Sequence, residues 1–259
     1  MQIEKFKKIV IKIGSSILVD RESKPKQVWL KEFSKDIKYL TKKKKEVVIV
    51  SSGAIALGCK HLGISKKGLK IDKSQAIASI GQIELMNFYK KTFDKYKIKI
   101  SQILLTLDDT EQRRRSINAK RTIDNLLSMG IVPIVNENDT TATTEIKYGD
   151  NDRLAARVAQ MMGADLLVIL SDIDGLYTSN PNISKRAKRV NKIKMIDKVI
   201  EKMAEKNQSV FGSGGMQTKI WAAKICLNSG CTTVITNGQE LNPIKTITKT
   251  NSSWFISSS

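Results

Sequence analysis

Short apolar runs, rich in Ile and Val, recur along the chain, and polar or turn-forming residues bound each of them. Continuous runs of this length are typical of strands buried on both faces, as in a parallel sheet. They predict strands at residues 8–13, 47–50, 100–105, 131–135, 166–170 and 232–236.

The segments between these runs carry the periodicity of helices. They predict helices at residues 27–41, 53–62, 74–93, 115–129, 152–162, 196–206 and 215–229. Several of these helices end at a glycine just before the next strand, and glycine is favoured at that position. Strands that alternate with helices predict a three-layer αβα sandwich with a central, mainly parallel sheet. We expect one domain over residues 1–259, with a polar, Ser-rich tail from about residue 243.

Polar or Gly-rich segments directly follow four of the predicted strands. In open α/β sheets, ligands bind beyond the carboxyl ends of the strands. Because parallel strands end at the same edge, we expect these segments to form one site. They are "GSS" (14–16), "SSGA" (51–54), "NEND" (136–139) and "SDIDG" (171–175).

A glycine-rich loop, "FGSGGMQTK" (211–219), comes before the last predicted helix. Its backbone N–H groups are suited to phosphate oxygens, and Lys219 lies within reach of a transferring group. Lys12, just before "GSS", offers a second positive charge. The alternative for the loop is a flexible hinge, and for Lys12 a surface side chain beside an ordinary turn. The P-loop pattern GxxxxGK[ST] does not occur in the sequence.

Negative charge is concentrated between residues 136 and 152, where five carboxylates stand against one Lys in a chain of formal net charge +20. They are Glu137, Asp139, Glu145, Asp150 and Asp152. One such residue is enough to cap the helix that follows. Clustered carboxylates repel one another and tend to be held by cations. The candidate cations are a substrate ammonium group, Mg²⁺ and the two lysines.

The overall basic charge first suggests a nucleic-acid partner. The basic residues are mostly Lys spread along the chain, however, and aromatic residues for base stacking are scarce. A Lys-rich but ordinary surface explains the same composition, although "RRR" (113–115) is dense. A non-catalytic protein that binds nucleic acid remains the rival hypothesis.

Three cysteines without CxxC spacing predict reduced, buried thiols. No apolar run is long enough for a membrane span, and the start of the chain does not read as a signal peptide. We therefore expect a cytoplasmic protein. His61 is the single histidine, so histidine-based catalysis and a zinc site are disfavoured.

Taken together, these segments resemble the amino acid kinase family, in particular its members that phosphorylate the γ-carboxylate of glutamate. The resemblance runs in order over nearly the whole chain, and "NEND" followed by "EIKYGDND" is its most specific part. It implies ATP-dependent phosphoryl transfer with Mg²⁺ held mainly by the ATP phosphates, in the first step of proline biosynthesis. The segments are "VIKIGSS", "VSSGAIALG", "SINAKRTIDNLLSMGIVPIVNENDT", "EIKYGDNDRLAARVA", "LSDIDGLYTSNP" and "GSGGMQTKIWAAKI".

The resemblance also implies roles for single residues. Lys12 and Lys219 would stabilise the transferring group, and Asp150 would orient these lysines. Substrate-binding positions would be Ser52, Asp139, Asn151 and the adjacent Asp152. ATP-binding positions would be Lys12, Ser171, Asp172, Ser213, Gly214, Gly215, Met216, Gln217, Thr218 and Lys219.

The resemblance implies further properties of the whole protein. Members of the family form dimers or tetramers, and functional coupling to glutamate-5-semialdehyde dehydrogenase is expected. Many members carry a C-terminal PUA domain, and this sequence ends where the kinase domain usually ends, so we expect a short form without it. An alternative is a related family enzyme acting on another small carboxylate or phosphate.

Overall fold

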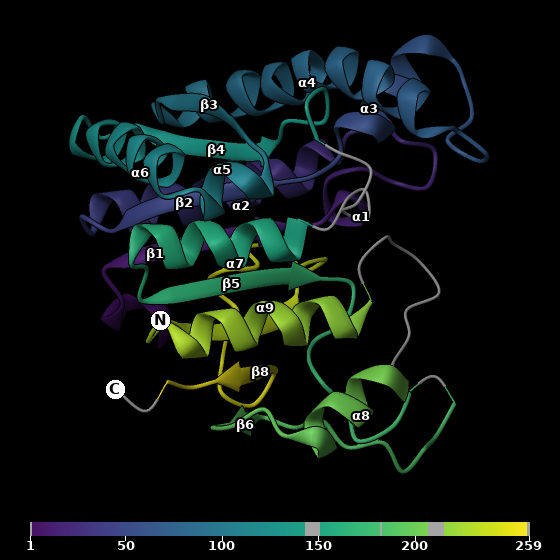
Figure 1. Cartoon of the computed structure of the whole chain (residues 1–259), viewed down its shortest axis with the longest axis vertical. Helices are drawn as coiled ribbons and strands as arrows, with labels where there is room; N and C mark the ends of the chain where they lie inside the picture. Colours follow the sequence, from purple (N-terminus) through teal and green to yellow (C-terminus); the bar gives the residue numbers. More distant parts are fainter. Residues whose placement is uncertain (1, 143–150, 182, 207–214, 258–259) are drawn as a thin grey trace.

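The computed structural model describes residues 2–142, 151–181, 183–206 and 215–257 (Figure 1). Its centre is an eight-stranded sheet of order β3-β4-β2-β1-β5-β7-β8-β6. The strands are β1 (Lys8–Ile13), β2 (Glu46–Ser51), β3 (Ile100–Leu105), β4 (Val132–Glu137), β5 (Leu166–Ser171), β6 (Lys192–Ile193), β7 (Thr232–Asn237) and β8 (Ser252–Phe255).

Strand β1 lies in the middle of the sheet and pairs in parallel with β2 on one side and β5 on the other. Lys12 stands in register with Val50 of β2 and Ile169 of β5. Within the described residues, β7–β8 is the antiparallel pair of strands in this sheet. The strands of the central region therefore end at one edge, and Lys12, near the end of β1, lies close to this edge.

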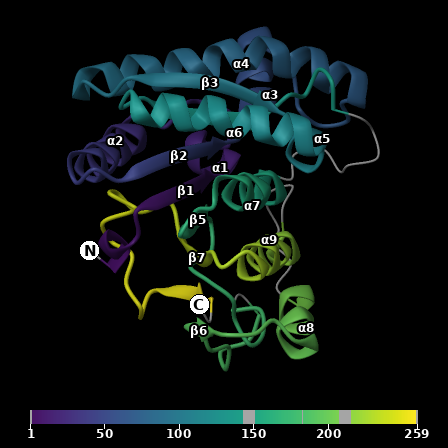
Figure 2. The same cartoon turned by 60° about the vertical axis from the view of Figure 1, so that its left-hand side comes forward.

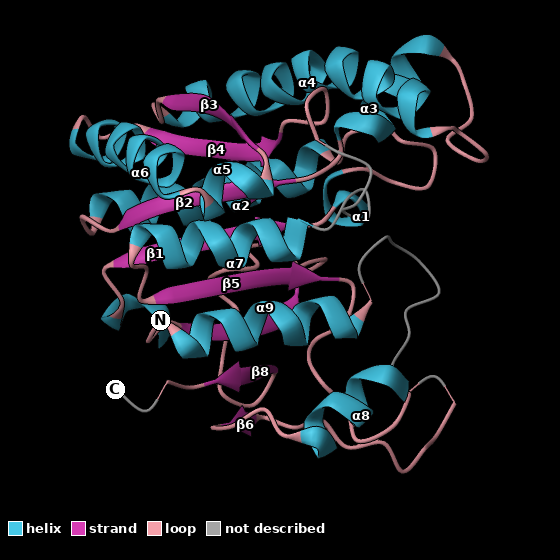
Figure 3. Ribbon diagram, in the orientation of Figure 1, coloured by secondary structure: helices cyan, strands magenta, loops and turns pink. Residues whose placement is uncertain are grey.

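Helices cover both faces of the sheet, as Figures 2 and 3 show. Ile9 and Ile11 of β1 pack toward α2 and α4, whereas Val10 packs toward α7 and α9. Successive apolar side chains of this one strand therefore pack into two hydrophobic cores, one on each face of the sheet. The helices are α1 (Ser15–Leu18), α2 (Gln27–Lys42), α3 (Ala54–Leu62), α4 (Ile71–Phe93), α5 (Leu107–Glu111), α6 (Arg113–Ser128), α7 (Asn151–Met162), α8 (Lys198–Lys206) and α9 (Met216–Asn228), with 3-10 turns at Gln2–Lys5 and Asp94–Tyr96.

Helices α3 and α4 cross at two glycines. A Cβ atom at Gly81 would lie 1.7 Å from the carbonyl oxygen of Ala54, and one at Gly58 would lie 2.2 Å from that of Ile77. Only glycine permits this approach of the two backbones. Gly53, in the left-handed region at φ 115°, precedes α3. The crossing therefore fixes the position of the N-terminus of α3, directly after the polar "SSG" turn.

The predicted αβα sandwich with a mainly parallel sheet is confirmed, and so are all six predicted strands and all seven predicted helices. The structure adds the short elements β6, β8, α1 and α5. Cys59, Cys226 and Cys231 are buried and unpaired, as expected. The helix that contains the "RRR" run is solvated, since Ile123 is its one buried residue.

The polar, Ser-rich tail expected from about residue 243 contains a buried strand. Strand β8 is buried and extends the sheet beyond β7. Two serines of β8 fit there because their hydroxyl groups find partners. Ser252 Oγ donates to Thr236 Oγ1 at 3.0 Å, and Ser253 Oγ donates to the carbonyl oxygen of Val190 at 2.6 Å. The Ser-rich composition of this segment therefore did not indicate that part of it forms a buried strand.

Candidate active site

Two lysines from different elements meet at one carboxylate. Lys12 Nζ lies 2.6 Å from Asp152 Oδ1, and Lys219 Nζ lies 3.1 Å from Asp152 Oδ2. Thr218 Oγ1 donates to Asp152 Oδ2 at 2.8 Å. Three segments that are far apart in sequence, β1, α7 and α9, therefore form one charged centre.

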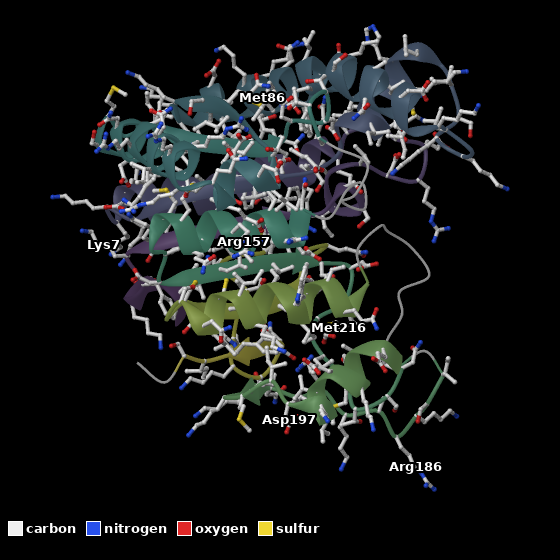
Figure 4. The ribbon with its side chains drawn as sticks, viewed as in Figure 1. Lys7, Met86, Arg157, Arg186, Asp197 and Met216 are labelled. Carbon is white, nitrogen blue, oxygen red and sulfur yellow. The ribbon has the colours of Figure 1, made fainter. Side chains whose placement is uncertain are left out.

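The fold brings these groups together by aligning two helices. Helices α7 and α9 lie side by side across the same face of the sheet, and both begin near its carboxyl edge (Figure 1). Met216, labelled in Figure 4, is the first residue of α9. Asp152 and Lys219 occupy the first turns of their helices, where backbone N–H groups are unpaired and favour an anion.

The charged centre is buried. Side-chain exposure is 10% for Lys12, 6% for Lys219 and 1% for Asp152. Burial by itself would raise the pKa of Asp152, but the ammonium groups of Lys12 and Lys219 outweigh it and hold this pKa well below the usual range of Asp. Two ammonium groups against one carboxylate leave an excess positive charge, which is suited to a phosphoryl group.

A polar pocket adjoins this centre. It includes residues from the carboxyl ends of β2 and β4 and from the first turns of α3 and α7. The full lining is Ser15, Ser52, Gly53, Ala54, Ile55, Ala56, Lys66, Asn136, Glu137, Asp139 and Asn151. Three residues expected to bind substrate, Ser52, Asp139 and Asn151, are thus brought to one place.

Asn151 is held firmly within this pocket. Its NH₂ group has two hydrogens to share among three oxygens within hydrogen-bond distance of Nδ2: the carbonyl oxygen of Ser51 at 2.6 Å, Ser52 Oγ at 2.8 Å and Asn136 Oδ1 at 3.0 Å. Asn136 Nδ2 in turn donates to Gln82 Oε1 at 2.7 Å. The side chain of Asn151 therefore links α7 to the end of β2.

Asp139 is electrostatically unusual. Burial, with a smaller contribution from the negative charge of Glu137, raises the pKa of Asp139 to about 7. A carboxyl group in this state gains from a nearby cation, because a positive charge would favour its ionised form. The pocket is therefore suited to a ligand that carries an ammonium group.

The segments expected to bind ATP lie at the same edge of the sheet. Ser171 ends β5 and its Oγ lies 3.1 Å from Asp172 Oδ1. Gly215 caps α9, and Met216 is buried whereas Gln217 is exposed. Asp150, Ser213 and Gly214 lie outside the described residues, so their predicted roles stay predictions. The carboxylate that contacts both lysines in the described structure is Asp152, which was expected to lie beside the substrate.

The described part of the chain offers neither a cluster of metal ligands nor a membrane-spanning helix. No group of three or more His, Cys, Asp or Glu side chains is arranged there to hold a metal ion. In the same ranges, no helix is long and apolar enough to cross a membrane.

Sequence reasoning missed Gln82, Asn136 and Lys66. Gln82 and Lys66 lie far from the recognisable motifs, in α4 and in the loop before it. Asn136 stood within the "NEND" segment, so its place after a strand was a usable signal. No local sequence pattern indicates a functional role for Gln82 or Lys66.

The chain belongs to the amino acid kinase family. The profile described as "Amino acid kinase family" matches residues 7–237. Within that class, the chain is 65% identical to a glutamate 5-kinase of Pelagibacter ubique over 99% of its length, and 53% identical to a glutamate 5-kinase of Agrobacterium fabrum over 97%.

Solved structures support the same fold. A UMP kinase from Bacillus anthracis matches 98% of this chain and 97% of its own with a TM-score of 0.66, and one from Ureaplasma parvum matches 96% and 98% with a TM-score of 0.62. Each is 17% identical to this chain, so these likenesses concern the fold alone. The chain spans 70% of the Pelagibacter relative and 65% of the Agrobacterium relative.

Proposed function

We propose that this chain transfers the γ-phosphoryl group of ATP to the γ-carboxylate of glutamate, giving glutamyl 5-phosphate for proline biosynthesis. The observation that carries the proposal is the buried Lys12–Asp152–Lys219 centre beside a pocket with Asp139 and Asn151. The identity to glutamate 5-kinases supports the choice of substrate.

The lysines carry the transfer step. Phosphoryl transfer depends mainly on positioning and on stabilising the charge of the transferring group. Lys12 and Lys219 offset the repulsion between two approaching anions, and Asp152 holds both ammonium groups in place. This assigns to Asp152 the orienting role that the resemblance had suggested for Asp150.

No general base is needed for this reaction. A glutamate side chain has a reference pKa of about 4.3, so the acceptor carboxylate is already ionised at neutral pH. Its oxygen attacks the γ-phosphorus, the bond from that phosphorus to the bridging oxygen breaks, and ADP leaves. The product is a mixed acyl phosphate, and no histidine takes part.

The pocket residues bind the rest of the substrate. Asp139 and Asn151 are assigned to the ammonium group, and Ser52 to the reacting carboxylate. Bound Mg²⁺ would offset negative charge on the ATP phosphates. It usually takes one or two carboxylates in addition to phosphate oxygens, and the exposed Asp172 at the end of β5 fits such a supporting role.

The direct test is an activity assay. The protein is incubated with ATP, Mg²⁺, glutamate and hydroxylamine, and glutamyl hydroxamate is expected. A folded sample that gives none would refute the proposal. A panel of other small carboxylates and of UMP separates a different family activity from this one. A micromolar or tighter nucleic-acid Kd without ATP turnover would instead support the binding-protein alternative.

Three properties of the whole protein remain proposals. They are a dimeric or tetrameric state, coupling to glutamate-5-semialdehyde dehydrogenase, and a single kinase domain over residues 1–259. Light scattering of the purified chain tests the first. The cytoplasmic location expected from the sequence also stays a prediction.

A further inference from the structure

Three buried amide side chains form a line from helix α4 to the substrate pocket. Gln82 is 8% exposed, Asn136 3% and Asn151 4%. Asn151 Nδ2 lies 3.0 Å from Asn136 Oδ1, and Asn136 Nδ2 lies 2.7 Å from Gln82 Oε1. The three residues come from α4, from β4 and from α7, so the line joins three elements.

Each amide in this line has one favourable orientation. The carbonyl oxygen of Ser51 lies 2.6 Å from Asn151 Nδ2, and turning the Asn151 amide over would place two oxygens against each other. Asn136 must therefore present its oxygen to Asn151. Its NH₂ group then points to Gln82, which has to supply an acceptor.

The line leaves one acceptor of Asn151 without a protein partner. Asn151 Oδ1 is buried and makes no hydrogen bond in the described structure. An unpaired buried acceptor is costly, and a ligand that donates a hydrogen bond would remove this cost. Asn151 lines the same pocket as Glu137 and Asp139. A positively charged N–H donor is therefore the ligand group that fits here.

We infer that Gln82 is a positioning residue for substrate selection: by accepting from Asn136 it keeps Asn136 Oδ1 on Asn151 Nδ2, and so supports the orientation, also favoured by the Ser51 carbonyl, in which the Asn151 oxygen faces the α-ammonium group of the substrate. Gln82 does not line the pocket and acts only through the other two amides. The inference rests on the proposed function, because it takes glutamate as the ligand.

The choice of glutamine at this position has a physical reason. Gln82 offers an acceptor oxygen without a negative charge, whereas a glutamate would add another carboxylate near Glu137 and Asp139. Its own Nε2 is buried without a partner, which lowers stability. Leucine or methionine would remove that unpaired donor, but Asn136 would then lose its acceptor.

The test compares Gln82→Met with wild type on glutamate and on glutarate, which lacks the amino group. We expect kcat/KM for glutamate to fall about tenfold, which corresponds to the loss of one hydrogen bond to a charged group. The kcat/KM for glutarate should change little. The ATP KM should stay within about twofold. Gln102→Met, the same substitution on the exposed face of β3, is the matched control.

A second substitution at Gln82 tests whether the lost acceptor oxygen causes the effect. Gln82→Glu restores an acceptor oxygen and should recover part of the preference for glutamate over glutarate. If Gln82→Met lowers kcat/KM equally for both substrates, or for neither, the positioning role is refuted. Should Gln82→Met fail to fold, Gln82→Asn, whose side chain is one methylene too short, takes its place.

A substrate-free measurement separates this inference from the proposed function. If wild type phosphorylates neither compound but folds, the proposed function fails. Solvent exchange of the Asn151 side-chain NH₂ protons, followed by NMR, still tests the line of amides. Exchange at least about tenfold faster in Gln82→Met supports it, and unchanged exchange overturns it.

Discussion

At the scale of single residues, two neighbours in sequence serve two different parts of the site. Asn151 and Asp152 begin α7, and successive residues of a helix point about 100° apart. Asn151 therefore reaches toward the end of β2, while Asp152 reaches Lys12 and Lys219. The start of one helix thus joins the polar pocket to the charged centre.

Asp152→Asn should abolish most activity. The substitution keeps the shape but leaves two buried ammonium groups without a counter-charge, so we expect kcat to fall about 10²- to 10³-fold. Stability should fall by up to about 3–5 kcal/mol. Hydroxamate formation and urea unfolding measure the two effects. A larger loss of kcat in Asp150→Asn than in Asp152→Asn would return the orienting role to Asp150.

Asp139 should make glutamate binding depend on pH. Because its pKa is raised to about 7, its carboxyl group is mostly neutral at pH 6 and mostly ionised at pH 8. Only the ionised form attracts the substrate ammonium group, so kcat/KM for glutamate should rise up to about tenfold over this range. Asp139→Asn should give a low and nearly flat profile. A wild-type profile without this rise would contradict the assignment.

Lys66 should contribute to binding of the substrate α-carboxylate. It is the cation among the side chains that line the pocket, and its side chain is exposed. Lys66→Ala should raise the glutamate KM about threefold to tenfold and leave kcat nearly unchanged. Lys67→Ala is the control. Equal effects of the two variants would mean that Lys66 acts only through the general surface charge.

At the scale of elements, the packing of α3 on α4 sets the position of the pocket. The two helices touch through their backbones at Gly58 and Gly81. Helix α3 begins directly after the Ser52–Gly53 turn, and α4 carries Gln82 next to the crossing. A change at the crossing should therefore reach both the Ser52 turn and the line of amides.

Gly81→Ala should destabilise the protein even though alanine favours helices. The new methyl group would meet the Ala54 carbonyl oxygen at 1.7 Å and the Gly58 nitrogen at 2.5 Å, so the helices must separate. We expect a loss of at least about 1–3 kcal/mol, measured by thermal or urea unfolding. Ser79→Ala, at an exposed position of the same helix, should have little effect. A Gly81→Ala protein as stable as wild type would mean that the crossing adjusts freely.

At the scale of the whole molecule, the large positive charge belongs to the surface. Lys12 and Lys219 are the buried lysines of the described chain, and both contact Asp152. Other basic side chains, such as Lys7 and Arg186 in Figure 4, lie at the surface. Most of the net charge of +20 therefore lies on the solvated surface, whereas the proposed chemistry depends on the buried Lys12–Asp152–Lys219 centre.

The C-terminal segment should prove to be part of the fold. Buried Asp36 of α2 accepts hydrogen bonds from the backbone N–H groups of Ile244 at 2.9 Å and Lys245 at 3.3 Å. Asp36→Ala removes the carboxylate oxygen that accepts both hydrogen bonds, so we expect a loss of about 1–3 kcal/mol in urea unfolding. The exposed neighbour Lys35→Ala is the control. An unchanged midpoint would mean that the segment adds no stability.

The sequence by itself determined the elements and the general nature of the site. Continuous apolar runs specify strands buried on both faces, and residues at the carboxyl ends of such strands gather at one edge. The positions of Lys12, Ser52, Asp139 and Ser171 at this edge could therefore be predicted from the sequence. Family motifs narrowed the chemistry to phosphoryl transfer.

Only the tertiary structure decided which groups meet. The direction of each side chain around the first turn of α7 brings Asp152 to the lysines. Gln82 reaches Asn136 from helix α4, a contact that no local pattern in the sequence indicates. The serines of β8 can lie in a buried strand because oxygen atoms from distant segments accept hydrogen bonds from their hydroxyl groups. These outcomes depend on contacts between residues far apart in the chain, and local propensity does not encode them.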